Sequence, residues 1–317
     1  MTVENVERVL VVGAGIMGHG FAQVFALNNL KVSLVDRTDE LLEQARGWIR
    51  KNLEYMVELG ELQRPQVEST LKLIQLDTDL PMRAKGVDYV LEAVSEDLEL
   101  KKTVFRQLDE AAPREAVLAT NTSSFDINEF SRVTRYPERV IGTHWFHPPQ
   151  ITPCVEIIPA DTTSQKTVDF TIAFMERIGK FPTLCKSAPG FIGNRIQFAM
   201  AAEALAIVEE GLATPQEVDR IVKSSFGFRL SAYGPFEICD QAGLDTYQAV
   251  FRYLYGKFNR EQFKPPRLLD TLVAQGRFGL KRQNGFYEYG GDAAESLRRE
   301  RDRKLYARLR LFQDEQK

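Results

Sequence analysis

Cysteine, histidine and long apolar runs are all scarce in this sequence. The three cysteines lie far apart and form no Cys-x-x-Cys pair, which favours reduced thiols over a disulfide framework. No apolar stretch approaches the ~20 residues that span a bilayer, and residues 1–8 are polar, so we expect neither a transmembrane nor a targeting segment. The formal net charge of −3 gives no positive field that would attract nucleic acid. It does not exclude a local patch that binds phosphate. We therefore expect a cytoplasmic protein with no membrane or nucleic-acid partner.

The length and patterning of the chain indicate two domains. A chain of 317 residues is too long for one ordinary hydrophobic core. Its 44% hydrophobic and 27% charged residues are typical of a globular enzyme. Apolar strands alternate with helices at first, whereas the residues after 183 predict helices only and end in a charged helix over 293–316. We expect an α/β domain over 1–187, of the Rossmann type with a doubly wound parallel sheet, and an all-helical domain over 188–317.

The alternating part predicts where ligands bind. Its expected strands cover residues 9–12, 31–35, 87–94, 116–120, 140–144 and 154–158, and its longer helices cover 38–59 and 97–111. A helix with many small residues is expected over 197–210. Residues 121–124 and His144 follow the carboxyl ends of predicted strands, which is where open α/β sheets bind their ligands.

A glycine-rich turn follows the first predicted strand. Gly13 allows the tight turn, Gly15 lets the backbone approach a pyrophosphate, and Gly18 lets the next helix pack closely on the strand. Ile16 and Met17 complete the turn, and the N-terminus of the following helix faces the phosphates. The turn therefore predicts a dinucleotide-binding site that includes all five residues.

Asp36 ends the second predicted strand, roughly 20 residues beyond the turn, as the dinucleotide-binding pattern requires. A carboxylate at this position accepts a hydrogen bond from the adenosine ribose 2′-hydroxyl and repels a 2′-phosphate. Arg37 follows directly, and its guanidinium could bind a phosphate, which would oppose this preference. Together these features predict that NAD binds here and is preferred to NADP.

His144 and Glu156 flank a stretch that several prolines stiffen. An imidazole and a carboxylate brought together by such a loop make an oriented general base, because the carboxylate fixes the ring tautomer and favours the protonated ring. Glu156 stands in an apolar run between Val155 and Ile157, where a carboxylate needs a partner. Next to an NAD site, this pair predicts a dehydrogenase that oxidises an alcohol.

These motifs together resemble the L-3-hydroxyacyl-CoA dehydrogenase family. The resemblance covers most of the chain, and its motifs are well separated and recur in the family's order. They are the glycine turn, Glu92-Ala93-Val94-Ser95-Glu96, Asn121-Thr122-Ser123-Ser124, the stretch from His144 to Glu156, Pro189-Gly190-Phe191-Ile192-Gly193-Asn194-Arg195, Gly279-Leu280-Lys281 and Gly285-Phe286-Tyr287.

The resemblance implies a catalytic role for four residues. His144 would be the general base, oriented by Glu156. Ser123 would hydrogen-bond the reacting oxygen, and Asn194 would complete the polar lining of the site. Taken alone, Ser123 also fits a helix N-cap, and Asn194 also fits a cap or turn.

The resemblance also implies cofactor contacts and an assembly. Glu96, Lys101 and Lys281 match family positions that contact NAD, although Glu96 alone also fits a solvated side chain. The second domain would take part in substrate binding and would form a homodimer. Its alanine-rich stretch over 197–208 can hardly be buried on all sides within one domain of this size.

One departure from the family is His147, which stands where the family usually has asparagine. We expect His147 to contact the cofactor or substrate, as asparagine does, but with a proton equilibrium near neutral pH. The His-x-x-His spacing of His144 and His147 also suggests a metal, yet no third ligand has matching spacing. We therefore expect no metal.

A second departure concerns the substrate. Members that act on acyl-CoA are basic in the helix after Asp36, whereas residues 52–61 are acidic here and leave Arg46, Arg50 and Lys51 as the basic support for coenzyme A. The resemblance favours oxidation of a 3-hydroxybutyryl-CoA-like thioester to the 3-keto compound. A free 3-hydroxy acid, as in the gulonate and carnitine dehydrogenase branches, remains the alternative. A non-catalytic dinucleotide-binding structural protein remains a third.

Overall fold

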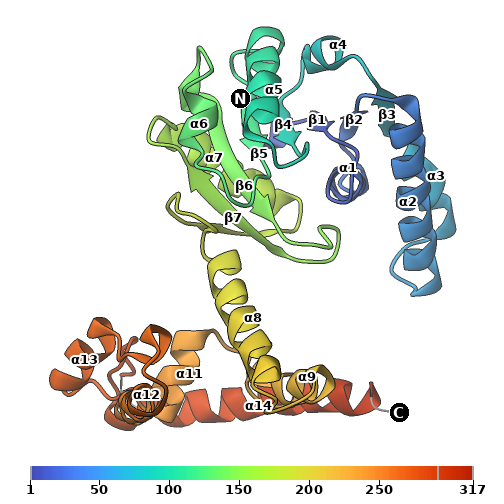
Figure 1. Ribbon diagram of the computed structural model, residues 1–317. Helices are drawn as coiled ribbons and strands as arrows, with labels where there is room; N and C mark the ends of the chain where they lie inside the picture. The colour runs from blue at the N-terminus through green and yellow to red at the C-terminus, as the bar shows by residue number, and fades with distance from the viewer. Residues whose placement is uncertain (1, 291–292, 316–317) are drawn as a thin grey trace. The chain divides into compact units, whose positions relative to one another are not determined.

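A computed structural model describes residues 2–290 and 293–315, drawn as a ribbon in Figure 1. Its sheet has eight strands in the order β3-β2-β1-β4-β5-β6-β7-β8. Neighbouring strands run parallel except β6 and β7, which are antiparallel. The strands are β1 (Arg8–Val12), β2 (Lys31–Val35), β3 (Ile74–Asp77), β4 (Tyr89–Glu92), β5 (Val117–Thr120), β6 (Val140–Trp145), β7 (Cys154–Pro159) and β8 (Phe181–Leu184).

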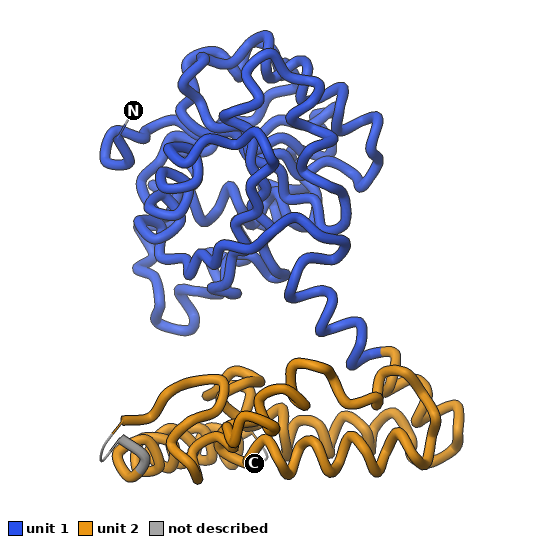
Figure 2. The backbone as a smooth tube through the Cα atoms, turned by 90° about the vertical axis from the view of Figure 1, so that its left-hand side faces the viewer, with its two compact units in different colours: residues 1–201 blue, residues 202–317 orange. Residues whose placement is uncertain are grey.

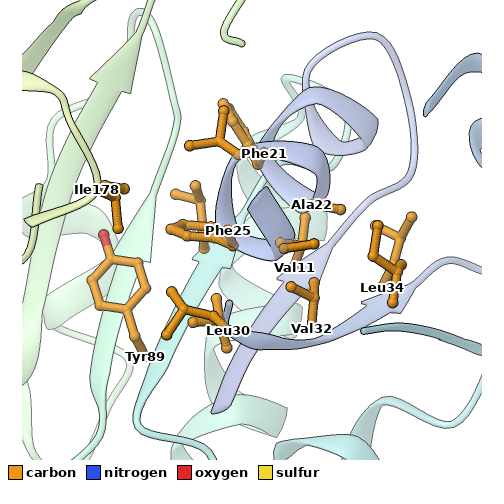
Figure 3. Close-up of a cluster of buried hydrophobic side chains, with 14 of the residues drawn as sticks. Val11, Phe21, Ala22, Phe25, Leu30, Val32, Leu34, Tyr89 and Ile178 are labelled. Atoms are coloured by element: carbon orange, nitrogen blue, oxygen red, sulfur yellow. The ribbon is translucent and has the colours of Figure 1, made fainter. Parts of the chain in front are cut away.

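The central strands are mostly apolar because helices cover both faces of the sheet. Alternate residues of β1 enter different cores: Val9 and Val11 lie on one side, and Leu10 and Val12 on the other. Figure 3 shows the first side, where Phe21 and Phe25 of helix α1 pack near Val11. The helices that cover the two faces are α1 (Gly18–Leu27), α2 (Asp39–Glu58), α3 (Arg64–Lys72) and α7 (Gln165–Arg177) on this side, and α4 (Leu80–Ala84), α5 (Leu98–Ala111) and α6 (Asn128–Ser131) on the other.

The predicted Rossmann-type doubly wound sheet is confirmed, and five elements of this domain are additions to the prediction. Each predicted strand is present, with bounds that shift by a few residues. The additions are β3, β8, α4, α6 and α7. Strands β3 and β8 are short edge strands with polar or proline residues, so they carry little of the apolar signal that marks a central strand.

The chain divides into two compact units, residues 1–201 and 202–317, coloured separately in Figure 2. The division falls inside helix α8 (Gly193–Glu209), which starts before the predicted residue 197. Thr214 and Glu217 form a capping box at the start of α9. Unit 2 also contains α9 (Pro215–Ser224), α10 (Phe226–Leu230), α11 (Pro235–Ala242), α12 (Leu244–Phe258), α13 (Arg267–Ala274) and α14 (Ala293–Asp314).

Asp240 organises the interior of unit 2. Its carboxylate is buried and accepts hydrogen bonds from the backbone N–H of Phe286 and Tyr287 at 2.9 and 3.0 Å and from the hydroxyl of Tyr289 at 2.8 Å. A Cβ added to Gly285 would lie 2.1 Å from its Oδ1, so glycine is required there. The Gly-Phe-Tyr motif near residue 286 is therefore a fold element of this unit.

The charged tail forms helix α14, which ends at Asp314. The described residues end at 315, so Gln316, the predicted end of this helix, lies outside them. Arg308 Nε donates to the carbonyl of Ser231 at 2.8 Å, and the rings of Phe312 and Phe228 lie 6.1 Å apart. These contacts attach α14 to α10 within unit 2. Within the described part of the chain, no helix is long and apolar enough to cross a membrane.

Candidate active site

The glycine turn between β1 and α1 leaves no room for side chains at two positions. A Cβ added to Gly18 would lie 1.7 Å from the carbonyl oxygen of Gly13, and one added to Gly13 would lie 2.5 Å from that of Ala93. At Gly15 nothing lies within 4 Å of an added Cβ. This open backbone directly before a helix N-terminus fits the pyrophosphate of a dinucleotide.

Asp36 is tied to the same turn. Its Oδ2 accepts a hydrogen bond from Ala14 N at 2.6 Å, and its Oδ1 accepts one from Arg37 N at 2.7 Å. The Arg37 side chain is exposed, and the side chain of Ile16 is 64% exposed. The end of β2 and the glycine turn of β1 therefore form one continuous surface that fits the adenosine half of NAD.

His144 and Glu156 face each other across the antiparallel pair β6 and β7. Their Cα atoms are register partners, and His144 Nδ1 lies 2.7 Å from Glu156 Oε2. Because a carboxylate accepts, Nδ1 carries the proton and Nε2 is left as the basic nitrogen. The imidazole ring lies against Phe146 and Phe191, with centroids 4.7 and 5.6 Å away, so apolar rings also fix its orientation.

Glu156 is held as a carboxylate although it is almost fully buried. Its Oε1 accepts hydrogen bonds from the backbone N–H of Ile192 at 3.0 Å and of Gly193 at 2.8 Å. Burial alone would raise the pKa of Glu156, but the hydrogen bonds from His144, Gly193 and Ile192 outweigh it and leave the pKa lowered. A charged Glu156 can stabilise a protonated His144.

Glu96 organises the loop that carries Ser123. Its Oε1 accepts hydrogen bonds from the Thr122 hydroxyl at 2.6 Å, from Ser123 N at 3.0 Å and from the Ser124 hydroxyl at 2.9 Å. The pKa of Glu96 is lowered, because these hydrogen bonds and the nearby Lys101 outweigh the opposing effect of burial. Glu96 thus fixes the position of Ser123, a contact that its motif did not reveal.

Lys101 is buried beneath this loop. Its Nζ lies 2.8 Å from Glu92 Oε1, 3.1 Å from the carbonyl of Val94 and 3.3 Å from Glu96 Oε2. Glu92 is fully buried and also accepts from the Thr120 hydroxyl at 2.6 Å. Glu92 ends an otherwise apolar strand, and a carboxylate in such a strand needs a partner. The sequence could have indicated this network by the same argument that singled out Glu156.

A cavity of about 450 Å³ brings nearly half of the predicted site residues together. Seven of them line it: Met17, Glu96, Lys101, Ser123, His144, His147 and Asn194, the last from the first turn of α8. Asn121, Trp145, Phe146 and Gln197 also line it, and no role was expected for them. Asn121 Oδ1 accepts from Trp145 N at 2.9 Å, so it joins the end of β5 to the end of β6 beside His144.

Lys281 is the predicted site residue that lies in unit 2. Its Nζ forms an ion pair with Asp245 at the start of α12. Among the residues that the structure describes, no group of three or more His, Cys, Asp or Glu side chains is placed to hold a metal ion.

Two family models match consecutive parts of the chain. The NAD binding domain of 3-hydroxyacyl-CoA dehydrogenase matches residues 8–188, and the C-terminal domain of the same enzyme matches residues 190–289. The chain belongs to the 3-hydroxyacyl-CoA dehydrogenase family. It is therefore an NAD-dependent oxidoreductase, and the alternative of a non-catalytic structural protein is withdrawn.

Relatives of this family resemble the chain over nearly its whole length. Hydroxyacyl-coenzyme A dehydrogenase, mitochondrial, from Sus scrofa is 34% identical and covers 90% of this chain and 91% of its own. 5-Formyl-3-hydroxy-2-methylpyridine 4-carboxylate 5-dehydrogenase from Mesorhizobium japonicum is 30% identical, and the match covers 97% of this chain and 99% of that protein. The crystal structure of a 3-hydroxyacyl-CoA dehydrogenase from Archaeoglobus fulgidus is similar, with a TM-score of 0.79 and 34% sequence identity. The match covers 96% of this chain and 99% of that chain.

Proposed function

We propose that this dehydrogenase oxidises the C3 hydroxyl of an L-3-hydroxyacyl-CoA of the 3-hydroxybutyryl type to the 3-keto compound, with His144 as general base. The observation that carries the proposal is the buried hydrogen bond of 2.7 Å between His144 Nδ1 and Glu156 Oε2 in the wall of a cavity. A ring held in this way offers Nε2 to a hydroxyl proton.

The proposed chemistry follows from the partners of the pair. NAD, when bound, accepts the hydride that leaves C3. His144 Nε2 takes the hydroxyl proton, and the Glu156 carboxylate stabilises the imidazolium that results. Ser123 and Asn194 line the same cavity and are proposed to hydrogen-bond the reacting oxygen, which gains negative charge as its proton leaves.

The proposed cofactor site extends from the glycine turn into this cavity. Gly13, Gly15, Ile16, Met17 and Gly18 would hold the pyrophosphate, with the ribose on Asp36 and Arg37. Glu96, Lys101 and His147 would lie near the nicotinamide half. Lys101 would act through Glu96, because its donors already have partners. Lys281 remains a proposed contact.

A free 3-hydroxy acid is the second candidate substrate, and the charge on α2 favours it. Arg50 is paired with Glu68 at 2.6 Å, and Arg46 lies 3.5 Å from Glu43, so two of the three expected cations already face carboxylates. The relative from Mesorhizobium japonicum is named for a pyridine carboxylate, and its similarity to this chain includes the charged tail region.

A substrate panel tests the proposal. NADH formation would be measured with 3-hydroxybutyryl-CoA, 3-hydroxybutyrate, gulonate and carnitine at matched concentrations. We expect the highest kcat/KM with the CoA thioester. A higher value with a free acid would move the assignment to the second candidate, and no turnover of any 3-hydroxy compound would contradict both.

We propose further that the chain is a homodimer and cytoplasmic. Helix α8 has no buried residue, and the side chains of Phe198 and Leu205 are each 64% exposed, as an uncovered association surface requires.

A further inference from the structure

Lys180 is a buried lysine that forms no ion pair among the described residues. It precedes β8, and its side chain is 7% exposed. Its Nζ donates hydrogen bonds to the carbonyl of Pro149 at 2.6 Å and to that of Thr152 at 2.9 Å. The same ammonium lies 5.0 Å from the centroid of the Trp145 ring. A buried cation is costly without strong partners, so this position calls for an explanation.

The two carbonyls belong to residues 146–153, which we call the β6–β7 loop. This loop leaves β6 directly after His144 and Trp145 and brings His147 into the wall of the cavity. Within it, the N–H groups of Ile151 and Thr152 donate to the carbonyl of Pro148 at 3.0 and 2.9 Å.

The opposite side of the loop packs on α1. A Cβ added to Gly20 would lie 2.5 Å from Pro149 Cγ and 2.9 Å from Gln150 Oε1. Glycine at this position therefore lets the loop approach the first turn of the helix that follows the dinucleotide turn. The β6–β7 loop thus lies between α1 and the ammonium of Lys180.

We propose that Lys180 is a positioning residue that fixes the β6–β7 loop and thereby places His147 in the active site. The inference rests on the proposed function for its kinetic consequence, but its structural part does not. Lys180 does not line the cavity, so it acts through the loop and not on the substrate. Three contacts from one ammonium join the loop to β6 and to the start of β8.

The protonation state of Lys180 follows from its surroundings. Burial lowers its pKa to about 8, and no charged neighbour contributes to the shift. The elements around Lys180 carry further titratable side chains, which are His19 on α1, His144 on β6, His147 in the loop, Cys154 and Glu156 on β7, and Lys166, Asp169, Glu176 and Arg177 on α7. Below that pH the ammonium makes charge-assisted hydrogen bonds and a cation–π contact; the neutral amine keeps two N–H donors but loses both advantages.

Trp145 reports the state of Lys180 directly. The chain has two tryptophans, so Trp48→Phe leaves Trp145 as the single indole. Its emission would be followed from about pH 6 to about pH 10, a range that spans the pKa expected for this buried lysine. We expect a transition with a midpoint near pH 8 that is absent when Lys180→Met is added. Identical titration curves with and without Lys180 would overturn the proposed contact.

Kinetics test the positioning role separately. Lys180→Met should raise KM for the hydroxy substrate roughly tenfold, which is about 1.4 kcal/mol, and leave kcat within about threefold. Lys180→Arg keeps the charge and the donors and should recover most of the loss. Lys186→Met is the matched control. Lys186 is an exposed lysine that follows β8, so its replacement should leave KM unchanged.

Two outcomes would overturn the positioning role while the proposed function stands. They are an unchanged KM in Lys180→Met, and a fall in kcat alone that Lys180→Arg does not restore. Failure of the proposed function has a different signature, since the unmodified enzyme would then turn over no 3-hydroxy compound while the Trp145 titration would still show its transition.

Discussion

The carboxylate of Glu156 lies in an apolar strand because three donors replace the water that it loses on folding. His144 Nδ1 satisfies one oxygen, and the N–H groups of Ile192 and Gly193 satisfy the other. Removing one partner of a buried charge pair typically costs about 3–5 kcal/mol, because the remaining charge stays buried. Substitutions at this pair therefore affect stability as well as activity, and a conservative replacement is needed to separate the two.

Replacing Asp36 tests the cofactor assignment. Asp36→Ala should raise KM for NAD roughly tenfold, equivalent to about 1.4 kcal/mol, and should narrow the preference for NAD over NADP because the repulsion of a 2′-phosphate is lost. Initial rates with both cofactors measure the change. The carboxylate also accepts from Ala14 N, so Asp36→Asn serves as the control that keeps an acceptor. Equal rates with NAD and NADP in the unmodified enzyme would refute the assignment.

Single residues differ in how well the sequence predicted their contacts. The pairing of His144 with Glu156 followed from residue type and a stiff connection, and the register of β6 and β7 confirms that they meet. The loop-fixing contacts of Glu96 and the ion pair of Lys101 depend on how the ends of β4 and β5 meet. Lys180 gave no signal, because its two partners are backbone carbonyls, which every residue carries.

At the level of helices and strands, the apolar central strands were predictable because both of their faces are buried. Helix α7 was missed although its buried residues Val168, Thr171 and Met175 recur at helical spacing. Edge strands β3 and β8 escaped prediction, since their apolar signal is weak and only tertiary packing selects them. The basic residues on α2 illustrate the same limit. Sequence alone counted Arg46, Arg50 and Lys51 as free cations, whereas Arg50 is paired with Glu68 of α3.

The charge on α2 also separates the two candidate substrates. The double substitution Arg50→Glu with Lys51→Glu should raise KM for 3-hydroxybutyryl-CoA roughly tenfold, about 1.4 kcal/mol, and the rise should shrink in high salt. A small free acid should be nearly unaffected. Arg106→Glu on α5, which packs on the other face of the sheet, is the control. Unchanged kinetics with both substrates would remove the basic support for a thioester.

Assembly is the prediction at the scale of the whole molecule. Helix α8 exposes apolar side chains along its length, and an exposed apolar surface of this kind marks an association site. Sedimentation at micromolar concentration should therefore give twice the chain mass of 36.1 kDa. Phe198→Glu should shift the protein toward monomer by placing a charge in the interface. A monomer in the unmodified protein would contradict the proposed homodimer.

The general base is the central claim, and His144→Gln tests it most directly. Glutamine has a similar reach, can donate its amide N–H to Glu156 and cannot take a proton. Turnover of the best substrate of the panel should fall by roughly 10²–10⁴, the usual contribution of a positioned base, while the affinity for NAD stays close to normal. Turnover within a few-fold of the unmodified enzyme, with NAD binding intact, would contradict the role of His144.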